Sequence, residues 1–214
     1  MKKTFLVFLL IFGGKFTHAQ ELPAKSAPIR LEVLGGHVAT AFQMIVSKPM
    51  FEHKKFDFFY ITSTEVPYES GKPIPVLNQS IVFYKPTKWL SGGLGGSYTA
   101  FGGFSPIAAV AFSHHRENFM ILAQPTIELK KQGLRQFLGI FEWSPINENI
   151  IRPYFLVQII TEWSNVHSMT QHRWRLGTQY KDLRFGGALN FYHFGAEPVN
   201  EYNAGLFILL LIKS

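Results

Sequence analysis

The chain of 214 residues contains no cysteine and few charged residues. The absence of cysteine excludes disulfides, thiolate metal sites, iron–sulfur clusters and cysteine nucleophiles. Charged residues make up 16% of the chain and aromatic residues 15%, whereas charged residues make up about 25% of a typical soluble domain. Such a composition excludes an intrinsically disordered chain. It fits a protein of one domain, or two small ones, that exposes apolar surface to something other than water.

The N-terminal residues have the pattern of a secretory signal. Lys2 and Lys3 precede a short apolar run that ends at Gly13, and small residues follow it. We therefore expect a cleaved signal peptide at 1–19, followed by a flexible periplasmic lead-in at 20–28. The apolar run is too short to cross about 30 Å of hydrocarbon as a helix.

Loss of this signal removes three lysines and lowers the formal net charge from +7 to +4. A mild positive charge of this size gives no argument for a nucleic-acid partner. An exported protein would also rarely meet nucleic acid, so we expect none.

Beyond the signal, the chain has no apolar run of the length of a transmembrane helix. The longest run, 206–212, is far shorter than the roughly 18 residues required, which excludes a helical inner-membrane protein. The dominant pattern is instead an alternation of period two. In 119–130 one parity is apolar, and the other contains Gln124, Glu128 and Lys130. This alternation is typical of a β-strand with one apolar and one polar face.

The alternation recurs in segments of a length that suits a membrane. A tilted strand crosses a bilayer with about 9 to 11 residues, whereas strands of soluble proteins average about 5 to 6. The expected strands are 29–35, 37–48, 56–65, 77–85, 89–101, 104–114, 117–130, 135–144, 150–163, 168–180, 182–193 and 201–213.

The sequence therefore predicts an all-β fold: a transmembrane antiparallel up-and-down β-barrel that occupies 29–214. We expect twelve strands, or ten if the first two segments are not part of the barrel, since bacterial single-chain barrels have an even number. A secreted soluble β-barrel or sandwich is the alternative, but it would have to cover the apolar strand faces. The connections alternate between two sets, as expected of a barrel with both termini at one end. On the assumption that both termini are periplasmic, the first set of connections lies on the periplasmic side.

Six short motifs occur in an order that is similar to a known group of proteins. They are FFYITST at 58–64, GFSP at 103–106, FEWSP at 141–145, RLGTQYK at 175–181, FGGALNF at 185–191 and YNAGLF at 202–207. In this order they resemble uncharacterised small outer-membrane β-barrel proteins of Bacteroidetes-type bacteria. The resemblance implies a cell outer-membrane location, outer-membrane lipid and the barrel-assembly machinery as partners, and no catalytic motif.

Charged residues on the parity expected to face the lumen are the best candidates for function. They are Glu128, Lys130, Glu142, Arg152, Glu162, Arg173, Arg175 and Arg184. Mixed charges in a narrow barrel commonly pair and fill it. The functional hypothesis is that Arg173, Arg175 and Arg184 lie side by side on neighbouring strands and favour anionic solutes.

The sequence thus predicts a small channel or a solute-binding barrel with a preference for small anionic solutes. The alternative is a closed barrel that acts as a structural or partner-docking membrane protein. A barrel hydrolase is less favoured, because the near-sequence Ser/His pairs are only Ser168 with His167 or His172, and Ser113 with His114. No G-x-S-x-G or H-E-x-x-H motif occurs, so we expect no enzyme activity, no metal and no cofactor.

Overall fold

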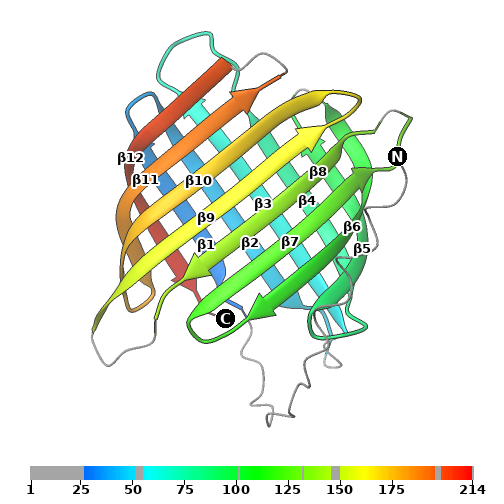
Figure 1. The fold of residues 1–214 in the computed structure, drawn as a ribbon, viewed down its shortest axis with the longest axis horizontal. Coiled ribbons are helices and arrows are strands. Elements are labelled where there is room, and N and C mark those ends of the chain that lie inside the picture. The colour runs from blue at the N-terminus through cyan, green and yellow to red at the C-terminus, as the bar shows by residue number, and fades with distance from the viewer. Residues whose placement is uncertain are drawn as a thin grey trace, which may run out of the picture.

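The computed structural model describes residues 27–51, 55–100, 102–131, 133–145, 150–195 and 199–213. The predicted signal peptide and most of the predicted lead-in lie outside these residues. The described part forms twelve β-strands (Figure 1). They are β1 (Ile29–Gly36), β2 (Ala39–Pro49), β3 (Phe56–Pro67), β4 (Val76–Tyr84), β5 (Leu90–Thr99), β6 (Gly103–His115), β7 (Phe119–Glu128), β8 (Arg135–Trp143), β9 (Ile151–Trp163), β10 (His167–Tyr180), β11 (Leu183–Phe194) and β12 (Val199–Ile212).

The twelve strands close into one antiparallel up-and-down barrel. Each strand pairs with its neighbours in the sequence, and β12 pairs with β1 from Ile29↔Ile212 to Gly36↔Gly205. This closure leaves no unpaired sheet edge. The prediction of a twelve-stranded barrel is confirmed, and β1 and β2 belong to it.

The two ends of the barrel differ in their connections. The terminal end carries the first residues of β1, the last residues of β12 and the turns at 116–118 and 181–182. The loop end carries the connections at 68–75, 129–134 and 164–166 and is the upper end in Figure 1. The alternation of connections predicted from the sequence is therefore present. None of the described residues belongs to a helix long and apolar enough to cross a membrane.

The outward face of the barrel is apolar around its circumference. Large apolar side chains are exposed on many strands, and Phe104 on β6 and Leu206 on β12 are each 72% exposed. At the described outward positions of the strands, the charged residues are Lys48 and Arg135, and both lie near strand ends. A continuous apolar belt of this kind does not occur on ordinary soluble monomers, whose largest apolar patches are about 300–600 Å².

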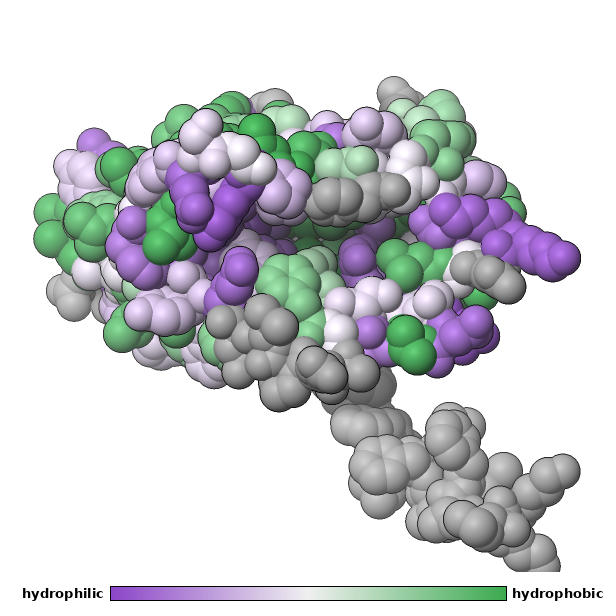
Figure 2. Space-filling model, turned by 90° about the horizontal axis from the view of Figure 1, so that it is seen from above, coloured by the Kyte–Doolittle hydropathy of each residue, from purple (hydrophilic) through white to green (hydrophobic). Residues whose placement is uncertain are grey.

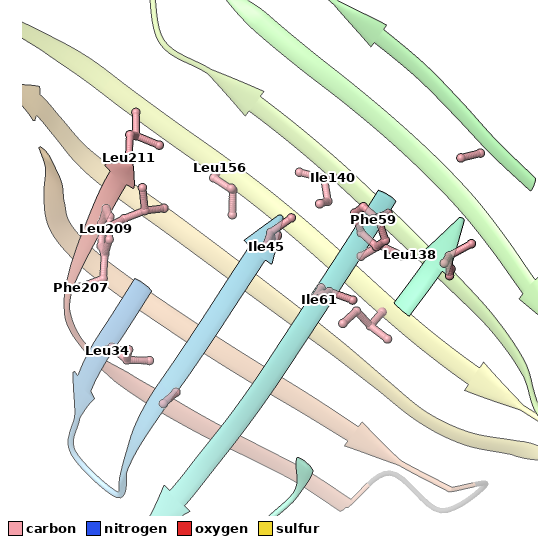
Figure 3. Close-up of a cluster of buried hydrophobic side chains, with 14 of the residues drawn as sticks. Leu34, Ile45, Phe59, Ile61, Leu138, Ile140, Leu156, Phe207, Leu209 and Leu211 are labelled. Carbon is pink, nitrogen blue, oxygen red and sulfur yellow. The ribbon is translucent and has the colours of Figure 1, made fainter. Parts of the chain in front are cut away.

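The inward face holds a packed apolar cluster that extends toward the terminal end. Figure 3 shows Leu34, Ile45 and Ile61 from β1 to β3 pointing toward Leu138 and Leu156 from β8 and β9 on the opposite wall. Each of these side chains is at most 9% exposed. The barrel is narrow enough for apolar side chains from opposite walls to share one buried cluster, which occupies much of the interior.

Candidate functional site

At the centre of the barrel, two arginines share one carboxylate. Arg173 Nη2 lies 2.7 Å from Glu32 Oε1, and Arg175 Nη2 lies 2.8 Å from the same oxygen. Arg175 Nε donates a further hydrogen bond of 3.1 Å to it. Arg173 is 2% exposed and Arg175 is fully buried. Because β10 carries both arginines and β1 carries Glu32, these contacts join strands that are not neighbours in the sheet.

A second carboxylate, Glu65, extends this central cluster toward the loop end. Its Oε2 accepts hydrogen bonds from Asn190 Nδ2 at 2.9 Å and from the Tyr192 hydroxyl. Its Oε1 accepts one from Asn203 Nδ2 at 3.0 Å. Asn190 in turn accepts a hydrogen bond of 2.9 Å from Arg175 Nη2. The central cluster therefore contains two carboxylates and two guanidinium groups, and its formal charges balance.

Near the terminal end, a separate cluster surrounds Glu142. Arg30 Nη1 lies 2.5 Å from its Oε2, and Arg184 Nη1 lies 2.7 Å from its Oε1. The Arg184 guanidinium also lies 4.4 Å from the ring centroid of Tyr154, and Arg30 donates a hydrogen bond of 3.2 Å to the Tyr154 hydroxyl. The contacts of Arg30 cross the interior from β1 to β8 and β9. The charge of Arg184 is paired with the Glu142 carboxylate.

The three predicted arginines face the interior from the neighbouring strands β10 and β11, but they do not lie at one height. In the β10–β11 register, Arg173 pairs with Asn190, whereas Arg184 pairs with Gln179, four residues beyond Arg175 along β10. At about 3.3 Å per residue, Arg184 therefore lies well below the other two. The expectation that all three lie side by side is wrong, because sharing a parity on adjacent strands does not fix their relative height.

The remaining predicted residues lie toward the two ends of the interior. Arg152 is half-buried and pairs in register with Gln179 near the terminal end. Glu142 belongs to the terminal-end cluster, while Glu128 and Glu162 lie at the loop end. The sequence reasoning missed Glu32 and Glu65, which are single acidic residues at inward positions of β1 and β3.

At the loop end, the interior opens into a cavity of about 560 Å³, which we call the mouth pocket. Figure 2 views the barrel from this end and shows a hollow between the walls, with hydrophilic residues inside it. The pocket is lined by Ser63, Thr64, Glu65, Pro75, Val76, Leu77, Thr99, Gly102, Glu128, Lys130, Leu134, Ile160, Glu162, Ser168, Met169, Gln171, Tyr192 and Phe194. Its volume is in the range of about 300–1,000 Å³ that is usual for small-ligand sites.

Two carboxylates on one side of the mouth pocket have different partners. Glu128 Oε2 accepts a hydrogen bond from the Leu134 amide at 2.9 Å and lies 3.1 Å from Lys130 Nζ. Glu162 Oε1 accepts a hydrogen bond of 2.6 Å from Gln136 Nε2. Gln136 Oε1 accepts one of 2.6 Å from Gln79 on β4, across the barrel. Gln136 thus links Glu162 on β9 to Gln79 on β4 through the interior.

In the Ser168/His167 pair considered from the sequence, the hydrogen bonds of the histidine go to other residues. His167 Nε2 lies 2.8 Å from Thr170 Oγ1, and its Nδ1 lies 3.0 Å from the Gly195 carbonyl oxygen. Ser168 lines the mouth pocket. The described residues contain no group of three or more side chains that could hold a metal ion. The absence of enzyme activity stays a prediction.

Comparison with protein-family models finds no match, and comparison with curated proteins finds none either. The fold and the two interior ion clusters therefore carry the functional argument. The resemblance to Bacteroidetes-type outer-membrane barrels stays a prediction from its motifs.

The buried pairing around Glu32 gives a stability prediction. Glu32→Gln leaves the guanidinium groups of Arg173 and Arg175 buried with less compensating charge. Removal of one partner from a buried ion pair costs about 3–5 kcal/mol, so we expect a loss of this size in the free energy of unfolding. Urea unfolding of the refolded protein in lipid vesicles measures it.

The matched control is Glu117→Gln in the exposed turn between β6 and β7. This control should unfold at the same urea concentration as the unchanged protein. Equal stability of Glu32→Gln and Glu117→Gln would contradict the assigned role of Glu32.

Proposed function

We propose that this protein is a closed outer-membrane β-barrel that binds a small solute in the mouth pocket. The observation that carries the proposal is the contrast inside the barrel. Its middle and terminal end are crossed by side-chain contacts between opposite walls, while its loop end opens into a cavity.

Membrane insertion is supported by the outward face. Its strands carry exposed apolar residues such as Leu94, Leu176 and Ile208, on β5, β10 and β12. In water this surface would favour aggregation, whereas the hydrocarbon of a bilayer satisfies it. If the termini lie in the periplasm, the mouth pocket faces the outside of the cell.

A continuous pore is opposed by three sets of side-chain contacts through the interior. Arg30 reaches Glu142 near the terminal end, and the apolar cluster fills the middle. Arg173 and Glu32 join β10 to β1 through the interior. A conducting path for hydrated ions would have to displace paired charges and packed apolar side chains, which is costly.

An anion preference is not part of this proposal. The arginines that suggested it from the sequence are held by Glu32 and Glu142, and none of the three lines the mouth pocket. Their charge is already compensated inside the protein, so it adds little attraction for a solute in the pocket.

Closure of the lumen predicts the outcome of planar-bilayer recording. The refolded full chain should show no steady conductance in 1 M salt, a condition of about 3 Å screening length in which small pores conduct readily. Circular dichroism of the same preparation must show β-structure, so that absence of current reflects a folded, closed barrel. Stable single-channel steps in such a preparation would contradict the closed-barrel proposal.

If the barrel lies in a membrane, the loss of stability caused by a charge on the outward face should depend on the depth of that charge in the bilayer. Leu206→Arg places a charge on the outward face in the middle of β12. It should lower the free energy of unfolding of the vesicle-inserted protein by about 2–4 kcal/mol. Ile212→Arg places the same charge at the end of the same strand, and should cost about 0–1 kcal/mol. Denaturant titrations of both variants in vesicles measure the difference, and equal costs would contradict membrane insertion.

A further inference from the structure

The charge balance of the mouth pocket indicates what kind of solute it takes. Among the described residues that line the pocket, the acidic ones are Glu65, Glu128 and Glu162, and the one cation is Lys130. Glu65 belongs to the charge-balanced central cluster, in which Asn190 links it to Arg175. Glu128 is balanced by Lys130. One acidic charge, that of Glu162, is left over.

Glu162 has a fixed position but no cation partner among the described residues. Its Oε1 accepts the hydrogen bond of Gln136, which is itself anchored by Gln79. Lys130 cannot serve both acidic groups easily, because its ammonium lies 3.1 Å from Glu128 and donates a hydrogen bond of 2.8 Å to Ser105. The Glu162 carboxylate therefore keeps acceptor capacity for a positively charged donor.

The rest of the lining is mainly apolar. Val76 and Leu77 lie on one side, and Ile160, Met169 and Phe194 contribute further apolar surface. The pocket thus combines apolar surface with a few placed charged groups, of which Glu162 alone lacks a compensating charge among the described residues. Apolar surface with a small number of precisely placed polar groups is the usual composition of a site for a small organic molecule. Partial removal from water also strengthens the attraction between a carboxylate and an ammonium group.

We propose that the mouth pocket binds a small organic cation: an apolar, ring-sized body that carries one ammonium group, with the ammonium beside Glu162 and the body against the apolar wall. This inference rests on the proposed binding function and specifies its ligand class. It reverses the preference for anionic solutes that the sequence suggests.

Three probes that differ only in their head group test the proposal. Tryptamine, tryptophol and indole-3-propionate share an indole ring and a two-carbon linker, and end in an ammonium, a hydroxyl and a carboxylate. Isothermal titration of the refolded full chain in a non-ionic detergent measures their affinities. Tryptamine should bind at least about 10-fold more tightly than tryptophol, as expected for a charge-assisted hydrogen bond. Indole-3-propionate should bind most weakly of the three.

Two variants and one control locate the charge effect. Glu162→Gln should abolish the difference between tryptamine and tryptophol, whereas Glu117→Gln at the terminal end should preserve it. Lys130→Met removes the cation of the pocket and should tighten tryptamine binding. Such a gain cannot result from misfolding.

The outcomes separate the ligand class from the binding function. Equal affinities of the three probes, or tightest binding of indole-3-propionate, would overturn the cation preference while leaving a solute-binding barrel. Failure of tryptamine to bind the folded protein would also overturn it. An open pore in bilayer recording would instead overturn the proposed function itself.

Discussion

The pairing of β1 with β12 is the constraint on which the rest of the structure depends. Eight residue pairs, from Ile29↔Ile212 to Gly36↔Gly205, close the sheet. After closure every strand has two neighbours, so the ladder leaves no edge of unpaired backbone groups. Closure also divides the side chains into two sets, because residues of opposite parity must point outward or inward. The apolar belt and the mixed interior both follow from that division.

The interior of a closed twelve-stranded barrel is occupied either by side chains or by water. In this protein side chains occupy most of it. Arg173 and Arg175 can be buried only because Glu32 and Glu65 lie within reach from β1 and β3. A buried guanidinium without a carboxylate would cost several kcal/mol. The same contacts that make the charges tolerable also close the interior below the mouth pocket. Stability and closure of the lumen are therefore one property.

Much of the fold could be predicted from the sequence, because it depends on local periodicity. The alternation in 119–130 and 171–181 correctly assigns Gln124 and Arg173 to the inside and Trp174 to the outside. Strand positions and the closed, twelve-stranded topology follow from the same pattern together with the even strand number of such barrels.

The site could be predicted only in part, because its contacts join residues that are far apart in the chain. Arg173 and Glu32 are separated by 141 positions, and their meeting depends on the register of four strands and on the width of the barrel. Strand parity predicts that Arg184 lies beside Arg173. The register of β10 and β11 instead pairs Arg184 with Gln179, six residues from Arg173 along β10. Glu32 did give a local signal, since it is a lone carboxylate between Leu31 and Val33 in an apolar segment. Such a residue at an inward position needs a buried cation.

The central claim is that side chains close the interior between the mouth pocket and the terminal end. The natural absence of cysteine makes single-cysteine labelling the most direct measurement, since no background thiol reacts. Ser63→Cys lies in the lining of the pocket, whereas Ala109→Cys lies in the apolar cluster at mid-height of β6. A small charged thiol reagent should label Ser63→Cys in the folded protein and label Ala109→Cys only after unfolding. Equal labelling rates at both positions in the folded barrel would show a water-filled lumen and contradict the account.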